Sequence, residues 1–407
     1  MKVTQLKDIV NSVTTEILGK DNVLNEDLTN ITDIGKEIID TDNIDNYVKK
    51  LVNHIGSVLF VNRLYNGSVP SVLMDSWEFG SILEKITADL PEANENDSWN
   101  LQDGQSYDQD VFYQPKVEAK FYNSKVTFDI PLSFTEEQVK ESFDNVNQLN
   151  GFVSMLQTSV QNSMTVKLDA LIMRTINNMT AQTLNASADK QVSTVTAVNL
   201  LADYNAMVNA NGDDKAVSAK DALQSPEFIK FASMRIALYQ DRMSKMSTLF
   251  NLGGKERFTP SDNLHLVLLS DFAKASDIYL ESNTYHNELV SLPNYETVPY
   301  WQGSGKGYAF DDISKIDVKT EGADTKPATV TQSGILGVMF DTNALGVSNL
   351  NQRVTTNYNA RAEFFTNWYK FDAGYYNDLN ENYVVFFIQD EPAPANTTTT
   401  PSTGGTQ

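Results

Sequence analysis

The feature that most constrains the fold is a long run of apolar residues at helical spacing in the middle of the chain. The run covers about eight turns and consists of Met155, Leu156, Val160, Met164, Leu168, Leu171, Ile172, Thr175, Ile176 and Met179. A helix of this length measures roughly 45 Å at 1.5 Å per residue, which exceeds the diameter of a small domain. We therefore expect one long helix that serves as a spine for other elements. Gly151 is expected to separate it from a shorter helix that begins near residues 135–138.

The segment that follows the spine, residues 193–355, alternates between helix and strand patterns. Apolar positions predict a helix near 200–208, and Ser225 with Pro226 is a typical helix start. The continuous apolar run at 264–270 is typical of a buried strand, and a helix is expected at 271–280. Further strands are expected near 297–301, 313–319 and 334–340. The alternation predicts a mixed α/β core.

The last part of the chain contains a second pair of strands and a polar tail. Residues 356–390 are rich in aromatic side chains and end in the strand sequence NYVVFFIQD. We expect this segment to return and pack on the long helix. Residues 391–407 are rich in Pro, Thr and Gly and have nothing to bury, which predicts a polar tail.

The chain before the spine divides into a helical region and a long excursion. Residues 1–75 contain two segments with apolar residues at helical spacing. Residues 76–133 contain about two dozen polar and acidic residues, followed by the alternating strand pattern of Val126, Phe128 and Ile130. The simplest arrangement is two long strands that run out to a tip and back.

The excursion is interpreted either as a solvated surface loop or as an arm that lies across a neighbouring subunit. Four large aromatic residues favour the arm, because interfaces are enriched in aromatic side chains and a solvated loop gains little from them. We therefore predict a subunit interface that includes Trp99, Tyr107, Phe112 and Tyr113.

Composition excludes several classes of function. The formal net charge is −22, so the bulk surface does not bind phosphate backbones, although an acidic inner wall is compatible with enclosing DNA. The absence of cysteine excludes disulfides, thiolate metal sites and cysteine nucleophiles. The first twenty residues do not form a signal peptide, and no apolar run reaches the roughly 18 residues of a membrane span. We expect a protein that is made in the cytoplasm and does not insert into a membrane.

Motifs that carry chemistry are absent or incomplete. Residues 303–307, GSGKG, resemble a phosphate-binding loop but lack the Ser or Thr that follows the lysine. His54, His265 and His286 are far apart in the sequence, and His265 is expected to be packed or hydrogen-bonded in its strand. The residues around Asp40, Asp42 and Asp45 resemble a calcium loop only superficially. We predict no catalytic residue, no cofactor and no metal site, and hence a protein that is not an enzyme.

The order of these parts resembles the major capsid proteins of tailed bacteriophages, whose fold is shared by encapsulin shells. The local features that carry the resemblance are TSVQNSMTVKLDALIMRTINNMT in the spine, LHLVLLSDFAKASDIYL with the later VPYW, and the closing NYVVFFIQ. The resemblance implies an α+β, HK97-like capsid fold and extends over nearly the whole chain. Its parts are an N-arm (1–75), an extended E-loop (76–133), a P-domain with the spine helix (134–192), an inserted α/β A-domain (193–355), P-domain return strands (356–390) and a tail (391–407).

The resemblance also implies a function. Copies of the chain are expected to form pentamers and hexamers that build an icosahedral shell around a phage dsDNA genome, without sequence-specific binding of the DNA. Portal and scaffolding proteins are the expected partners, and the virion is the expected location. The alternatives are an encapsulin-like compartment, another virion protein such as a tail tube or sheath subunit, and an acidic α/β enzyme. The long helix argues against the tail proteins, and the lack of a polar constellation argues against the enzyme.

Overall fold

The computed structural model divides into two compact units. Unit 1 comprises residues up to Ile172 together with Gly346–Tyr376, and unit 2 comprises Met173–Leu345 together with the residues from Asn377 onward. The residues that the structure describes are 69–74, 83–91, 99–100, 102–104, 114–135, 146–186, 193–212, 216–281, 295–302, 309–321 and 327–390, with the single positions 11, 15, 93, 95 and 112.

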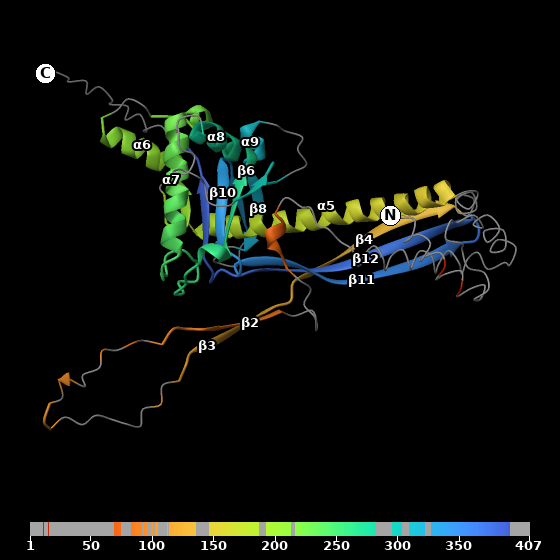
Figure 1. The fold of residues 1–407 in the computed structure, drawn as a ribbon, viewed down its shortest axis with the longest axis horizontal. Coiled ribbons are helices and arrows are strands. Elements are labelled where there is room, and N and C mark those ends of the chain that lie inside the picture. Colours follow the sequence, from red (N-terminus) through yellow and green to blue (C-terminus); the bar gives the residue numbers. More distant parts are fainter. Residues whose placement is uncertain are drawn as a thin grey trace, which may run out of the picture. The chain divides into compact units, whose positions relative to one another are not determined.

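Unit 1 contains two sheets and the first part of the long helix α5 (Figure 1). After a 3-10 turn at Pro70–Val72, its elements are β1 (Leu73–Met74), β2 (Leu83–Ala88), β3 (Val117–Tyr122), β4 (Lys125–Thr135), α5 (Val146–Ala186), β11 (Leu345–Asn359) and β12 (Phe364–Asn377). The larger sheet has the strand order β1-β11-β12-β4, and β2 and β3 form a separate two-stranded sheet. Strand β1 is parallel to β11, whereas β4 is antiparallel to β12 from Thr135↔Phe364 to Lys125↔Gly374.

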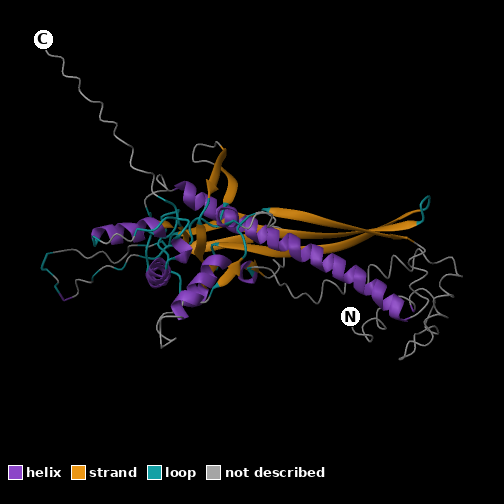
Figure 2. Ribbon diagram, turned by 90° about the horizontal axis from the view of Figure 1, so that it is seen from above, coloured by secondary structure: helices purple, strands orange, loops and turns teal. Residues whose placement is uncertain are grey.

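The larger sheet of unit 1 has one buried face and one polar face. Alternate residues of β12 from Phe365 to Ala373 are buried, as a strand with a period of two requires. Phe128 lies against Phe371, with 5.0 Å between ring centroids, and Phe134 stacks on Phe365 at 5.7 Å. Figure 2 shows the long strands beside α5, whose apolar stripe is buried from Val160 to Met179. The predicted spine helix is therefore confirmed.

Two sequence predictions about unit 1 are wrong. Gly151 does not separate two helices, because α5 runs without interruption from Val146 to Ala186. A single glycine costs only about 1 kcal/mol in a helix, which the buried stripe outweighs. The strand at 125–135 is not the returning strand of the excursion, because it pairs with β12, and the returning strand is β3. The predicted helices of residues 1–68 and the helix start at 136–138 lie outside the described residues, apart from two single positions.

Unit 2 is built around a five-stranded mixed sheet with helices packed on it. Its elements after α5 are β5 (Ala197–Asn199), α6 (Leu200–Ala210), α7 (Pro226–Met243), β6 (Leu264–Leu269), α8 (Ser270–Glu281), β7 (Glu296–Val298), α9 (Phe310–Ile313), β8 (Ile316–Glu321), β9 (Pro327–Gln332), β10 (Ile335–Asp341) and β13 (Tyr383–Phe387), with 3-10 turns at Ala222–Gln224 and Ser261–Asn263. The sheet order is β5-β13-β10-β6-β7, and β8 and β9 form a separate hairpin.

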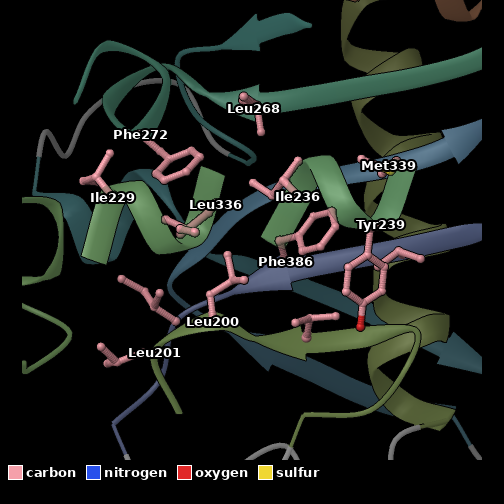
Figure 3. Packing of buried hydrophobic residues seen from close by; sticks show 14 of the residues in the cluster. Leu200, Leu201, Ile229, Ile236, Tyr239, Leu268, Phe272, Leu336, Met339 and Phe386 are labelled. Carbon is pink, nitrogen blue, oxygen red and sulfur yellow. The ribbon is translucent and has the colours of Figure 1, made fainter. Parts of the chain in front are cut away.

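The core of unit 2 lies between the sheet and helices α6, α7 and α8. Figure 3 shows Ile236 and Tyr239 of α7 facing Leu336, Met339 and Phe386 of the sheet, and all of them belong to one buried cluster. The helices begin where the sequence predicts. The Ser225 hydroxyl accepts a hydrogen bond from the amide of Phe228 at 3.3 Å, which caps α7. The predictions of α6, α7, β6 and α8 are confirmed.

A buried polar network joins the last turns of α5 to the sheet of unit 2. The Tyr383 hydroxyl lies 2.8 Å from Oγ1 of Thr180. The Asn177 side-chain amide donates to the carbonyl of Trp301 at 2.6 Å, and the Trp301 indole donates to the carbonyl of Ile335 at 2.9 Å. Buried polar groups that are paired in this way orient α5 on the sheet, because any other register would leave them unpaired.

The limits of the two compact units do not coincide with the domain boundaries expected from the sequence. The expected strand pair of residues 356–390 is not a pair, because β12 lies in the sheet of unit 1 and β13 lies in the sheet of unit 2. Strand β13 is buried along its whole length and lies between β10 and β5, inside the five-stranded sheet. Strand β11 begins at Leu345, inside the predicted A-domain, and belongs to unit 1 from Gly346 onward.

Candidate assembly surfaces

The hairpin of β2 and β3 presents two very different faces. Six residue pairs connect the strands, from Leu83↔Tyr122 to Ala88↔Val117. The half-buried face consists of Leu83, Lys85, Thr87, Glu118, Lys120 and Tyr122, and the exposed face consists of Glu84, Ile86, Ala88, Val117, Ala119 and Phe121. A hydrogen bond from the amide of Asp89 to the carbonyl of Lys116, 2.9 Å long, extends the ladder by one step.

The exposed face of this hairpin is the apolar one. Ile86, Val117 and Phe121 are all more than half exposed, whereas Lys85 and Lys120 lie on the half-buried face. In an antiparallel sheet with one solvated face the pattern is normally the reverse. A contiguous exposed apolar face marks a contact surface. In the sequence this surface was not singled out, although the alternation at 84–88 and 117–121 is a visible signal for it.

The predicted interface residues lie in the excursion beyond the hairpin. Trp99 is 95% exposed and Phe112 is 85% exposed, so neither ring is packed against the other or against the rest of the chain. Gly104 has a φ of +87°, a left-handed turn conformation that glycine adopts without strain. Tyr107 and Tyr113 lie outside the described residues. The prediction that these four residues contact a neighbouring subunit remains a prediction.

The solvated face of the larger sheet in unit 1 has a polar character. The Arg353 guanidinium donates to Asp372 at 2.7 Å, and the Thr127 hydroxyl donates to the same carboxylate at 2.6 Å. The hydrogen bond from Arg353 lowers the pKa of Asp372, and the bond from Thr127 acts in the same direction. These contacts connect residues of three neighbouring strands of one sheet, β11, β12 and β4.

The described residues contain no arrangement that suggests catalysis. They include no group of His, Asp and Glu residues that could hold a metal ion. His265 lies with its Nε2 atom 3.0 Å from Oγ1 of Thr342 and its ring beside Phe340, and burial lowers its pKa. The prediction that it is packed and hydrogen-bonded is confirmed. The candidate loop at 303–307, the other two histidines and the aspartates at 40–45 lie outside the described residues.

The shifted tyrosines of the structure are explained by packing. Burial raises the pKa of Tyr369 and Tyr383, and burial with a hydrogen bond to Asp277 raises the pKa of Tyr295 to about 12. Groups with such pKa values do not exchange protons near neutral pH. Within the same described part of the chain, no helix has the length and apolar character needed to cross a membrane.

Several solved structures of phage capsids are similar to this chain. They include the capsid of Staphylococcus phage Andhra, with 10% identity, coverage of 81% of this chain and 86% of that chain, and a TM-score of 0.48. The mature capsid of bacteriophage PhiM1 has 11% identity, coverage of 81% and 90%, and a TM-score of 0.44. The capsid of cyanophage P-SCSP1u has 10% identity, coverage of 79% and 87%, and a TM-score of 0.40.

No curated protein sequence is a significant match to the chain. A family model does match it, the model of the Phi29-like phage major capsid protein, over residues 6–387. This range includes the hairpin, the long helix, both sheets and all the helices described above. Because the match extends over most of its length, the chain belongs to the Phi29-like phage major capsid protein family and is a structural protein of a phage shell.

Proposed function

We propose that the chain self-assembles as pentamers and hexamers into an icosahedral shell that encloses a dsDNA genome. The observation that carries the proposal is the exposed apolar face of the β2–β3 hairpin. The hairpin acts as an arm that lies across a neighbouring copy. Trp99, Tyr107, Phe112 and Tyr113 contact that neighbour beyond the end of the hairpin.

The physical argument rests on the weakness of a two-stranded hairpin by itself. Such a hairpin is marginally stable in water unless its apolar face is covered. Covering Ile86, Val117 and Phe121 contributes about 1.5–3 kcal/mol for each side chain, before the cost of ordering the arm. A shell repeats this contact in every copy, so that modest individual contacts add up to a stable particle.

The arrangement of the elements supports an assignment of the HK97-like parts. The hairpin corresponds to the E-loop, the remainder of unit 1 with the first part of α5 corresponds to the P-domain, and unit 2 corresponds to the A-domain. This assignment moves β13 from the P-domain, where its position in the sequence suggests it belongs, to the A-domain. Residues 1–75 correspond to the N-arm.

The charge of the chain supports a shell that encloses DNA without binding it. A net charge of −22 repels phosphate backbones, so packed DNA is contained by the wall and does not adhere to it. Portal and scaffolding proteins are the proposed partners in assembly. The protein is synthesised in the host cytoplasm and becomes part of the virion, with a structural and not a catalytic role.

Electron microscopy of the purified, concentrated protein tests the proposal, both alone and after co-expression with the other head proteins of its phage. We expect closed icosahedral particles or free pentamers and hexamers. A monodisperse monomer under every condition would overturn self-assembly.

A deletion tests the role of the arm separately. Removing residues 95–110 is expected to leave a soluble, folded subunit, because Trp99 and the other described residues of this segment are exposed. The shortened subunit should fail to close shells. Normal particles from the deletion variant would show that the arm is dispensable and would leave self-assembly itself intact.

A further inference from the structure

Residues 243–259 of unit 2, which follow helix α7, form a tip that doubles back on itself. Ser247 and Arg257 face each other across an antiparallel bridge with two backbone hydrogen bonds, each 3.0 Å long. The amide of Thr259 donates to the carbonyl of Met243 at 2.8 Å and closes the base of the tip.

The inner side of this tip is held by buried polar contacts. The side chain of Asn251 accepts from the amide of Lys255 at 2.8 Å and donates to its carbonyl at 2.7 Å. Arg257 is paired with Glu381 at 3.4 Å, and the amide of Gly253 donates to the carbonyl of Leu379 at 2.9 Å. With its backbone fixed at both ends and in the middle, the tip is a pre-organised surface.

The outer side of the same tip carries large apolar side chains. Met246 and Phe258 are the residues next to the Ser247–Arg257 bridge, one on each side of the tip. Both are about half exposed, and Leu249 is more than half exposed. These three residues, called the tip patch, are ordered without being covered, and an exposed cluster of this kind marks a contact site.

The charges around the tip patch differ in sign from those of the chain as a whole. Residues 241–258 contain four basic residues, Arg242, Lys245, Lys255 and Arg257, and two acidic ones, Asp241 and Glu256, which gives +2 in a chain of net charge −22. Glu381 pairs with Arg257, so the other three cations and the two acidic residues of this segment leave a net charge of +1. A weakly positive rim around an apolar centre is attracted to an acidic protein surface. It has too few cations to bind DNA, and its apolar centre offers nothing to a phosphate backbone.

We propose that the tip patch is a contact between copies of this chain in the shell, with an acidic surface of the neighbouring copy over it. The inference rests on the proposed self-assembly, because a shell surrounds each subunit with further copies of the same acidic chain. The rim gives this contact a fixed orientation, since general repulsion between copies is relieved only where a positive surface meets a negative one.

Oxidation of methionine side chains measures the coverage of the patch without any substitution. Met246 is 45% exposed and Met207 of α6 is 41% exposed, so in the free subunit both should oxidise at similar rates. In assembled particles we expect the rate at Met246 to fall by roughly tenfold or more, as for a side chain that leaves solvent. An unchanged rate at Met246 in intact particles would overturn the proposal.

Cross-linking identifies the molecule that covers the patch. Particles are assembled from a mixture of isotopically light and heavy chains, and a lysine-reactive cross-linker captures the neighbours of Lys245 and Lys255. Peptide pairs that combine light and heavy masses are expected, because they join different copies. Cross-links that join these lysines only to another head protein, to the same copy or to nothing in the shell would refute a copy–copy contact.

Substitution separates this proposal from the self-assembly on which it rests. Leu249→Glu is expected to reduce particle yield by about tenfold through a buried, unpaired charge, whereas Met207→Glu is the matched exposed control. Circular dichroism and thermal melting of both free subunits verify that they fold. If the wild type forms particles and Leu249→Glu gives the same yield, only the proposed contact at the tip patch is overturned. If the wild-type chain never assembles, the proposed function itself is overturned.

Discussion

The centre of unit 2 and the β2–β3 hairpin use apolar residues in opposite ways. Every residue of β10 and β13 is buried, and the side chains of one face, including Met339 and Phe386, pack in one cluster with α7 inside a single subunit. In the hairpin, Ile86, Val117 and Phe121 point into solvent. The same residue types therefore stabilise the subunit in the first region and are available for a neighbour in the second. A shell protein needs both, because it must fold alone and then bind its own copies.

The largest expected effect is the difference in stability between a variant with a substitution in the centre of unit 2 and one with a substitution in the hairpin. Phe386→Ala should lower the free energy of unfolding by about 3–5 kcal/mol, because the ring is fully buried against Tyr239 and leaves a cavity. Phe121→Ala should change it by less than about 0.5 kcal/mol, since its ring is exposed. Chemical denaturation of the free subunits measures both. Equal losses of unfolding free energy in the two variants would contradict the difference between the two regions.

For particle yield, we expect a substitution in the hairpin to have a larger effect than one in unit 2. Ile86→Ser is expected to reduce particle yield by roughly tenfold, because it removes an apolar contact that every copy repeats. Ile278→Ser on α8 is the matched control, since Ile278 is 63% exposed and Ile86 is 64% exposed. Quantitative electron microscopy compares the yields. If both variants assembled like the wild type, the hairpin face would have no role in the shell.

A smaller loss of stability is expected when the buried polar network of unit 2 is interrupted. Tyr383→Phe removes the hydroxyl that contacts Thr180 at 2.8 Å and the carbonyl of Ile176 at 3.3 Å. The expected loss is about 1–2 kcal/mol of unfolding free energy, because the buried partners keep their polar atoms without a bond. Tyr300→Phe serves as the exposed control and should be neutral. A neutral Tyr383→Phe would mean that the network does not hold α5 on the sheet.

The smallest expected effect concerns pH and the polar face of the sheet in unit 1. The pKa of Asp372 is lowered in the folded state by its bond with Arg353, so its contribution to stability is present above the ordinary carboxyl pKa. That contribution is lost as the pH falls from roughly 4 towards the lowered pKa. Asp372→Asn should remove this part of the acid sensitivity, with little change of the melting temperature at neutral pH, because the Arg353 side chain is 44% exposed and water screens the pair. A melting profile against pH that is identical in both proteins would exclude the effect.

The local elements of unit 2 were predictable because their signals are local. Ser225 followed by Pro226 marks the start of α7, and the short apolar run at 264–269 is typical of a buried strand. The pairing of strands was not predictable in the same way. Strands β12 and β13 are separated by only a few residues, yet they lie in different sheets. Partners far away in the sequence decide this, since β12 pairs with β4 and β13 with β10.

Only some of the residues that we propose as contacts were predicted from the sequence, and none of these contacts is tested. Trp99 and Phe112 stood out because large aromatic residues are unusual in a polar segment, and both are exposed. The apolar face of the hairpin and the tip patch were missed. Whether Ile86 or Lys85 is exposed depends on what packs against each face of the hairpin. The exposure of Met246 likewise depends on how the chain folds back after α7.

By itself, the sequence determined the long helix, the acidic character of the chain, the order of helices and strands in unit 2 and the resemblance to capsid proteins. These properties depend on periodicity, composition and order, all of which are carried by residues close together in the chain. The tertiary structure alone decided that α5 continues through Gly151, that β4 and β13 join sheets distant in sequence, and which apolar side chains remain exposed. Exposure is decided last because a side chain is covered only by what packs on it, and most of those partners lie far along the chain.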